Sequence, residues 1–260
     1  MNPLNITHSS DGSIKLVAIH GLGSASTVWK MLREQFSSEV DFITLDLPGH
    51  GRSAMKATRE MNPAKLAVIV KEELAANGID EFHLTGNSLG GWVALEMGSA
   101  FPKSIHSLTA LAPAGLWLAP QVKKSYKLDT TRLLAKSTYR FAAPLLKVKP
   151  IRSLGFQLVS PQWEKIPLEV CLDATVAMGS STGYTKIWQA MLGNRFDKPI
   201  PEELPITVVF GDTDNTLPSA NCQEKSLVPS HSEWIVLERS GHAPMWDQVE
   251  TVAQLIKDRF

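Results

Sequence analysis

The order of apolar and glycine-rich segments predicts an α/β fold: a mostly parallel sheet with helices on both faces and an inserted helical cap. Short β-branched runs alternate with segments of helical spacing, which is typical of strand–helix–strand units joined by right-handed crossovers. Glycine-rich turns follow most of the predicted strands. These turns are expected at one edge of the sheet, where open α/β sheets bind their ligands. One long segment lacks strand signals and interrupts the alternation.

The first predicted strand covers residues 14–19 and ends in H-G-L-G at 20–23. A helix is expected after this turn, with Ser26 or Thr27 as its N-cap. Hydroxyl side chains at that position accept hydrogen bonds from the free N–H groups of the first helical turn.

The second predicted strand covers residues 40–45 and runs into D-L-P-G-H-G-R-S at 46–53. Its density of proline and glycine predicts a sharp loop at the end of the strand. A helix is expected over residues 62–76, beginning at Asn62 or Pro63, because apolar residues recur there at helical spacing.

The next strand, 82–85, feeds the sequence G-N-S-L-G-G at 86–91, and a helix opens near Trp92. A serine between two glycines on a strand-to-helix turn is typical of a nucleophile elbow, in which strained backbone turns the hydroxyl of Ser88 outward. The alternative is a plain glycine-rich turn. The helix N-terminus behind Ser88 would supply free N–H groups and partial positive charge to a developing anion.

After a strand at 105–111, the segment 116–199 shows no clear strand, and its prolines divide it into short helices. We predict that it is a helical cap inserted into a core domain formed by residues 1–115 and 200–260. The alternative is a run of helices packed on one face of the sheet.

Strand signals return at 205–210 and at 234–237, which end in G-D-T-D at 211–214 and in a loop containing G-H at 241–242. A helix is expected from Ser219 into the region of Leu227. A second, amphipathic helix is expected from about Gln248 to the C-terminus.

The composition limits the kinds of molecule that the chain is expected to bind. The 260 residues carry 26 basic and 26 acidic side chains, which gives no reason to expect a nucleic-acid partner. Cys171 and Cys222 show no zinc or disulfide spacing and are expected to be buried and free. No metal site and no organic cofactor is expected, since neither metal-ligand spacing nor a nucleotide-binding motif occurs. No signal peptide or membrane span is expected. A cytoplasmic monomer or homodimer is therefore predicted.

These motifs, in this order, resemble those of the α/β-hydrolase fold superfamily over essentially the whole chain. The resemblance implies that Ser88 is the nucleophile and His242 the general base that takes its proton. It implies Asp214 as the acid that orients the imidazole, from the position of the acid in the family's G-x-x-D pattern. Asp212 is the alternative.

An oxyanion hole needs two N–H donors directed at the developing charge. The residue after the nucleophile, Leu89, supplies one backbone N–H, and the resemblance implies Leu22 in the H-G-L-G loop as the second. His20 is expected to hydrogen-bond to nearby loops rather than to react. His50 and Arg52 are expected to hold the loop after the second strand.

A serine at the elbow, where dehalogenases and epoxide hydrolases have aspartate, favours acyl chemistry. The predicted activity is hydrolysis of a small carboxylic ester, lactone or thioester through an acyl-enzyme. Two alternatives stay open: a C–C bond hydrolase of the meta-cleavage product type, whose elbow is similar, and a non-catalytic ligand receptor of the same fold. Trp117 and Met245 lie beside predicted active-site loops and are candidates for the substrate pocket.

Overall fold

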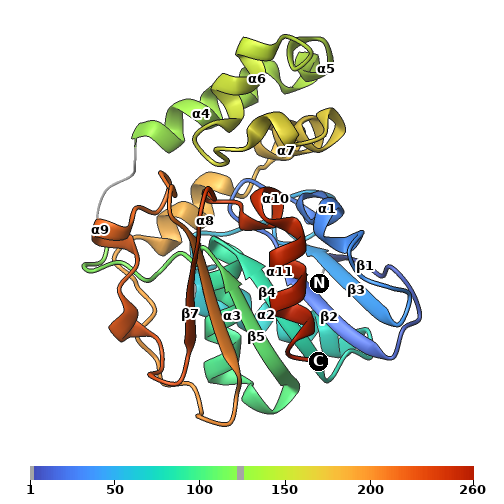
Figure 1. Ribbon diagram of the computed structural model, residues 1–260, viewed down its shortest axis with the longest axis vertical. Helices are drawn as coiled ribbons and strands as arrows, with labels where there is room; N and C mark the ends of the chain where they lie inside the picture. Colours follow the sequence, from blue (N-terminus) through green and yellow to red (C-terminus); the bar gives the residue numbers. More distant parts are fainter. Residues whose placement is uncertain (1–2, 122–125) are drawn as a thin grey trace.

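Seven strands form one sheet in the computed structural model, which describes residues 3–121 and 126–260 (Figure 1). Their order across the sheet is β1-β3-β2-β4-β5-β6-β7, and every pair is parallel except β1 with β3. The predicted mostly parallel sheet is confirmed. The strands are β1 (Asn5–Thr7), β2 (Ile14–Ile19), β3 (Val40–Asp46), β4 (Phe82–Asn87), β5 (Ile105–Leu111), β6 (Ile206–Gly211) and β7 (Glu233–Leu237).

The inner strands are covered on both faces, which explains their nearly continuous apolar sequences. Every residue of β3, β4 and β6 is buried. Strand β1 is not predicted from the sequence, because a strand of three residues at the edge of a sheet is too short to show an alternating pattern. It pairs antiparallel with the end of β3, where the Asn5 side chain donates to Asp46 Oδ2 at 3.0 Å.

Two helical layers enclose the sheet (Figure 1). On one face, α2 (Pro63–Ala76) and α3 (Leu89–Ala100) pack against the central strands in one apolar cluster that includes Leu66, Val93 and Leu84. A second cluster joins Leu32, Val252 and Leu16, and so places a different set of helices against the other face. These helices are α1 (Lys30–Arg33), α10 (Pro244–Asp247) and α11 (Val249–Lys257).

The chain between β5 and β6 is helical and contains no strand in its described part. Figure 1 shows α4 to α7 beyond one edge of the sheet, outside both helical layers. We call residues 116–199 the cap; the domain division at these positions stays a prediction. Prolines start two of its helices, because Pro150 lies in the first turn of α6 and Pro167 is the N-cap of α7. The cap helices are α4 (Tyr126–Thr138), α5 (Ala142–Leu145), α6 (Lys149–Phe156), α7 (Leu168–Ser180) and α8 (Tyr184–Met191).

Helix α2 begins where the sequence predicts. The Asn62 side chain accepts a hydrogen bond from Lys65 N at 2.9 Å, and Pro63 is the first helical residue. The helix also ends at the predicted residue, Ala76.

Three local predictions are wrong. Neither Ser26 nor Thr27 caps the first helix, which is a short 3₁₀ turn, η1 (Ser26–Trp29), followed by α1. A residue that is distant in the sequence takes over the role of the cap. The backbone N–H of Ser26 donates to Asp46 Oδ1 at 2.7 Å, so this N–H group needs no acceptor from a neighbouring side chain. Helix α3 begins at Leu89 rather than near Trp92.

The third wrong prediction is the single helix from Ser219 into the region of Leu227. The structure has two short pieces there, α9 (Ser219–Cys222) and η5 (Lys225–Leu227). Between them Glu224 N turns away to donate to Leu116 O at 2.8 Å, which ties this segment to the start of the cap.

Cys171 and Cys222 are both free and buried, as predicted. Among the helices of the described ranges, none has the length and apolar character required to cross a bilayer.

Candidate active site

Ser88 occupies the turn between β4 and α3 in a backbone conformation that L-residues rarely adopt, with φ 55° and ψ −115°. Two close approaches make this turn possible. A Cβ on Gly86 would lie 2.2 Å from Gly90 O, and a Cβ on Gly90 would lie 2.0 Å from Ile19 O. Only glycine fits at either position, so the G-x-S-x-G pattern has a direct steric cause here.

His242 and Asp214 meet although 28 residues separate them. His242 Nδ1 donates to Asp214 Oδ2 at 2.9 Å, and the carboxylate is fully buried. The second oxygen, Oδ1, accepts from the backbone N–H groups of Thr216 and Leu217, each at 2.8 Å. Burial acts to raise the pKa of Asp214, but His242 and these two N–H donors outweigh it and lower the pKa below its usual value. The acid therefore stays ionised beside the imidazole.

The loop that carries His242 lies against the elbow. Asn87, the residue before Ser88, donates through Nδ2 to His242 O at 3.0 Å and to Leu111 O at 3.1 Å. This buried amide fastens the histidine loop and the end of β5 to the turn. Ser88 Oγ makes no hydrogen bond to His242 in the described structure, and such bonds often tighten only when substrate is present.

Asp212, the alternative acid, contacts a different group. Its Oδ1 accepts from Ser240 N at 3.2 Å, which braces the loop that leads to His242. The imidazole of His242 donates its hydrogen bond to Asp214 instead.

The two predicted oxyanion donors flank the elbow. A Cβ on Gly21 would lie 3.2 Å from Ser88 Cβ, so the H-G-L-G loop lies directly beside the serine. Leu89 is the first residue of α3, where backbone N–H groups have no acceptor within the helix. Among the described residues, neither the Leu22 N–H nor the Leu89 N–H donates a hydrogen bond.

His20 ties two of the loops together. Its Nε2 accepts from Leu47 N at 3.0 Å, so its Nδ1 carries the proton and donates to Gly21 O at 2.7 Å. Burial lowers the pKa of His20, which keeps the ring neutral.

The loop after β3 is held mainly by Asp46 and His50. Asp46 Oδ2 accepts from Arg52 N at 2.9 Å, so the backbone of Arg52 makes this contact. His50 Nδ1 donates to Pro48 O at 3.0 Å. Burial and the nearby His20 ring lower the pKa of His50 to about 3, so this ring is also neutral.

Sequence patterns missed the part of the cap that lies over these loops. A Cβ on Gly23 would come within 2.9 Å of the side chains of both Met178 and Tyr184, so these residues cover the H-G-L-G loop. Gly183 N donates to Gly49 O at 2.9 Å and joins the cap to the loop after β3. No short-range signal marks these residues, because the contacts span more than a hundred positions.

A second missed contact joins the cap to the histidine loop. Asp247 Oδ2 accepts from Gly241 N at 2.8 Å, and Asp247 Oδ1 accepts a hydrogen bond from Ser160 Oγ. Ser160 is fully buried, and Asp247 is 8% exposed. Nearby, Ala243 N donates to Val159 O at 3.2 Å. The cap is thus hydrogen-bonded on both sides of His242.

Trp117 and Met245, the predicted pocket residues, are both buried. The Trp117 ring meets Trp92 edge-on at 5.2 Å, and its N–H donates to Asn194 O at 2.8 Å. Met245 belongs to the apolar cluster under α10 and α11. Their role in a pocket stays a prediction.

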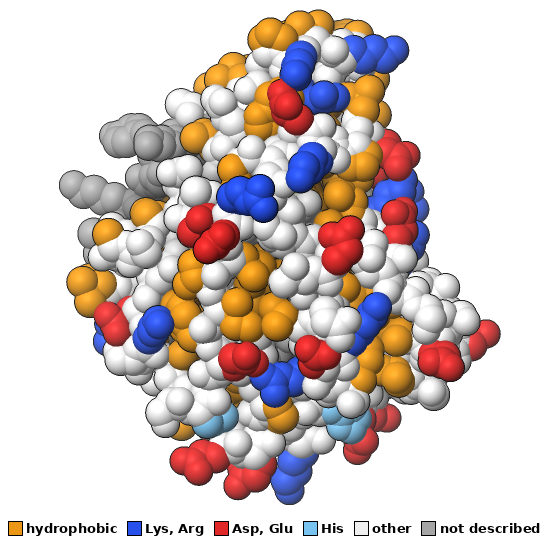
Figure 2. Space-filling view, in the orientation of Figure 1, with side chains coloured by type: hydrophobic (Ala, Val, Ile, Leu, Met, Phe, Trp, Pro, Cys, Tyr) orange, Lys and Arg blue, Asp and Glu red, His pale blue; other side chains and the backbone are white. Residues whose placement is uncertain are grey.

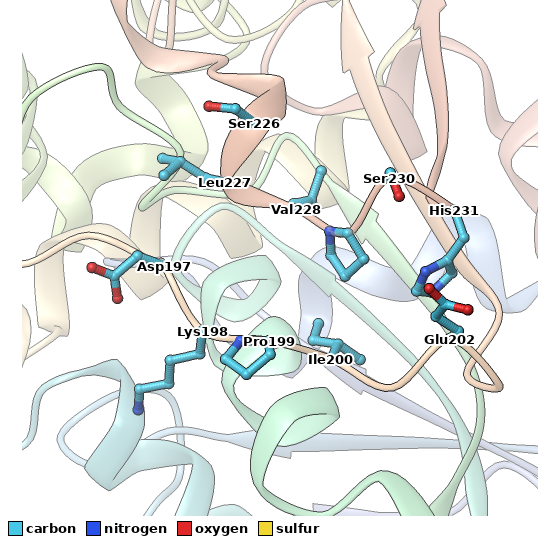
Figure 3. Close-up of a pocket in the computed structure, with 11 residues that line it drawn as sticks. Asp197, Lys198, Pro199, Ile200, Glu202, Ser226, Leu227, Val228, Ser230 and His231 are labelled. Carbon is cyan, nitrogen blue, oxygen red and sulfur yellow. The ribbon is translucent and has the colours of Figure 1, made fainter.

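A surface groove of about 480 Å³ lies elsewhere, between the segments 197–202 and 226–231 (Figure 3). Its lining is open and mixes polar side chains such as Lys198 and Glu202 with apolar ones such as Ile200. None of the candidate catalytic residues lines it. Within the described ranges, no three His, Cys, Asp or Glu side chains gather in a way that would hold a metal ion.

Comparisons with known proteins agree with this architecture. The chain is 24% identical over 255 residues to a pimeloyl-[acyl-carrier protein] methyl ester esterase of Aeromonas hydrophila subsp. hydrophila, covering 93% of each protein. It is 26% identical over 247 residues to Lipase 3 of a Moraxella species, covering 92% of this chain and 74% of that protein.

Among solved structures, the enol-lactonase of Burkholderia xenovorans LB400 matches 98% of this chain and 95% of its own, with a TM-score of 0.73 and 16% identity. The model of the alpha/beta hydrolase family matches residues 16–255, from β2 to the last helix. The chain therefore belongs to the alpha/beta hydrolase family.

Proposed function

We propose that this chain is a serine hydrolase that cleaves a small ester-like substrate through an acyl-enzyme, with Ser88, His242 and Asp214 as its triad. The observation that carries the proposal is the hydrogen bond from His242 to a buried, ionised Asp214. The loop that carries His242 is also hydrogen-bonded to the elbow through Asn87. A carboxylate in this position holds the imidazole with Nδ1 protonated, so Nε2 is free to accept a proton.

In the proposed reaction, Ser88 Oγ attacks the acyl carbon while its proton passes to His242 Nε2. The negative oxygen of the tetrahedral intermediate accepts hydrogen bonds from the N–H groups of Leu22 and Leu89. The intermediate collapses, and the leaving alcohol or thiol takes the proton from His242. Water then attacks the acyl carbon and gives a proton to His242 Nε2. As the second tetrahedral intermediate collapses, the bond between the acyl carbon and Ser88 Oγ breaks, His242 returns this proton to Ser88 Oγ, and the acid is released.

Carboxylic esters, lactones and thioesters are the proposed substrates because all react by acyl transfer to an oxygen nucleophile. The named relatives include an esterase and a lipase, and a structural neighbour is an enol-lactonase. These names support the class and leave the acyl group open. Met178 and Tyr184 of the cap, which cover the H-G-L-G loop, are the side chains we expect to limit its size.

The test is labelling with a fluorophosphonate probe, followed by a chain-length series of p-nitrophenyl esters, a lactone panel and a C–C diketone substrate. We expect labelling at Ser88 and ester or lactone turnover. In Ser88→Ala both should fall to background, a loss of about 10⁴-fold or more in kcat. Turnover that survives in Ser88→Ala would refute the assignment. A well-folded chain that is neither labelled nor active would favour the receptor alternative.

A further inference from the structure

The outer face of α6 carries an exposed apolar stripe. Val148, Ile151, Leu154 and Leu158 recur every three or four residues, and they are 48%, 39%, 61% and 42% exposed. The opposite side of the helix packs inward, since Phe156 is 5% exposed and its ring lies 6.2 Å from Trp246. Helix α6 therefore shows apolar side chains to solvent as well as to the core.

Neighbouring elements extend this surface. Leu133, Leu134 and Phe141 are 65%, 49% and 67% exposed. The other side of α4 is packed, because a Cβ on Gly179 of α7 would lie 2.7 Å from Ala135 O. Figure 2 shows apolar and basic side chains together at the cap end of the molecule, with acidic side chains beside some of the basic ones. We define the outer cap surface as the seven exposed apolar residues Leu133, Leu134, Phe141, Val148, Ile151, Leu154 and Leu158.

The segment that carries the outer cap surface is rich in basic residues. Residues 130–163 contain six basic and no acidic residues, in a chain whose overall charge is zero. Arg132 turns inward and donates to Met178 O at 2.7 Å. Lys136, Arg140 and Lys147 are exposed, and Lys149 pairs with Glu164, an acidic neighbour at the edge of the surface, at 2.8 Å. The apolar side chains thus lie among three exposed cations, Lys136, Arg140 and Lys147, that make no ion pair with the described residues.

We infer that the outer cap surface docks the protein onto an anionic lipid bilayer. Lipid accepts the two kinds of side chain together, because apolar groups enter the acyl boundary while Lys and Arg reach the phosphates. A second copy of the chain fits poorly, since a two-fold contact would place like charges against each other. The inference is independent of the proposed function.

Vesicle co-sedimentation of the full chain tests the inference, with Ser88→Ala as the background so that lipid hydrolysis does not intervene. The vesicles are phosphatidylcholine alone, or phosphatidylcholine mixed with phosphatidylglycerol. We expect binding to the anionic vesicles, weak binding to the neutral ones, and loss of binding as NaCl is raised.

Variants locate the contact. Lys136→Gln with Lys147→Gln should weaken partitioning about 25-fold, at about fivefold for each cation. Leu154→Ser should weaken partitioning about tenfold, because the variant loses the apolar side chain that would enter the lipid. Lys103→Gln and Val236→Ser are matched controls, exposed residues outside the cap, and should bind like the parent.

Failure to bind anionic vesicles at low salt would overturn the inference. So would equal binding to both vesicle types, or binding that the cap variants leave unchanged. A concentration-dependent dimer that Leu154→Ser abolishes, without vesicle binding, would assign the surface to a second copy of the chain instead.

Discussion

Two residues of the proposed triad, Ser88 and Asp214, are held in place by hydrogen bonds to backbone groups. Ser88 stays in its strained conformation because its own N–H donates to Leu111 O at 3.0 Å and its carbonyl accepts from Trp92 N and Ala114 N. Asp214 is held by the N–H groups of its own turn. These backbone bonds fix the site before substrate binds, which is what preorganised catalysis requires.

At this scale, Asp214 and Asp212 can be told apart by one substitution each. Asp214→Asn should lower kcat about 10³- to 10⁴-fold, because the amide no longer stabilises the imidazolium or holds the correct tautomer. Asp212→Asn should keep most of the activity, since Asp212 accepts from Ser240 N and makes no bond to His242 in the described structure. Ester turnover of both purified variants is the measurement.

The same pair of variants shows what would contradict the assignment. A larger loss in Asp212→Asn than in Asp214→Asn, with both proteins folded by circular dichroism, would transfer the acid role to Asp212.

At the scale of elements, the cap and the sheet meet at the loops that carry the proposed chemistry. Gly183 binds the loop after β3, Met178 covers the H-G-L-G loop, and Ser160 reaches the histidine loop through Asp247. Burial raises the pKa of Asp247, and the hydrogen bonds from Ser160 and Gly241 oppose this rise. The cap therefore supports the position of His242 as well as covering the site.

We predict that Ser160→Ala destabilises the protein by about 1–3 kcal/mol, because it leaves a buried carboxylate oxygen without its donor. It should also lower kcat more than it raises KM, since the loop of His242 loses its support from the cap. Urea unfolding and steady-state kinetics measure the two effects.

Ser153→Ala is the matched control, a cap serine whose hydroxyl bonds, among the described residues, only to Gln157 just after the same helix. It should change stability by less than about 0.5 kcal/mol. Equal behaviour of the two variants would refute the role given to Ser160.

At the scale of the whole molecule, the buried histidines make stability depend on pH. Burial lowers the pKa of His50 to about 3 and that of His83 to about 4, and it also lowers the pKa of His20. In the unfolded chain these rings take up protons near pH 6.5, so the unfolded state binds more protons below that pH. Stability should therefore fall as the solution is acidified from about pH 6.5.

His50, whose pKa is lowered to about 3, gives the clearest test. Its burial should remove about 2 kcal/mol of unfolding free energy between about pH 7 and about pH 5. His50→Gln removes the titrating group, so its stability should fall less over this range than that of the parent. Urea midpoints at the two pH values give the comparison, and an unchanged difference would contradict the explanation.

Much of the fold follows from short stretches of sequence. Strand β2 and strand β5 begin and end at the predicted residues, because runs of β-branched and apolar residues bounded by turns define their own length. The elbow is equally local, since the steric demands on Gly86, Ser88 and Gly90 arise within five positions and from the strand beside them. Asn62 likewise caps α2 through a residue three positions away.

The tertiary structure decides the contacts between residues that lie further apart in the sequence. It assigns Asp214 rather than Asp212 as the partner of His242, replaces the expected cap at Ser26 by Asp46, and joins Ser160 to Asp247. The physical reason is that a local pattern determines backbone geometry within a few residues. The direction and partner of a polar side chain depend instead on which distant segment the packed sheet and cap bring beside it.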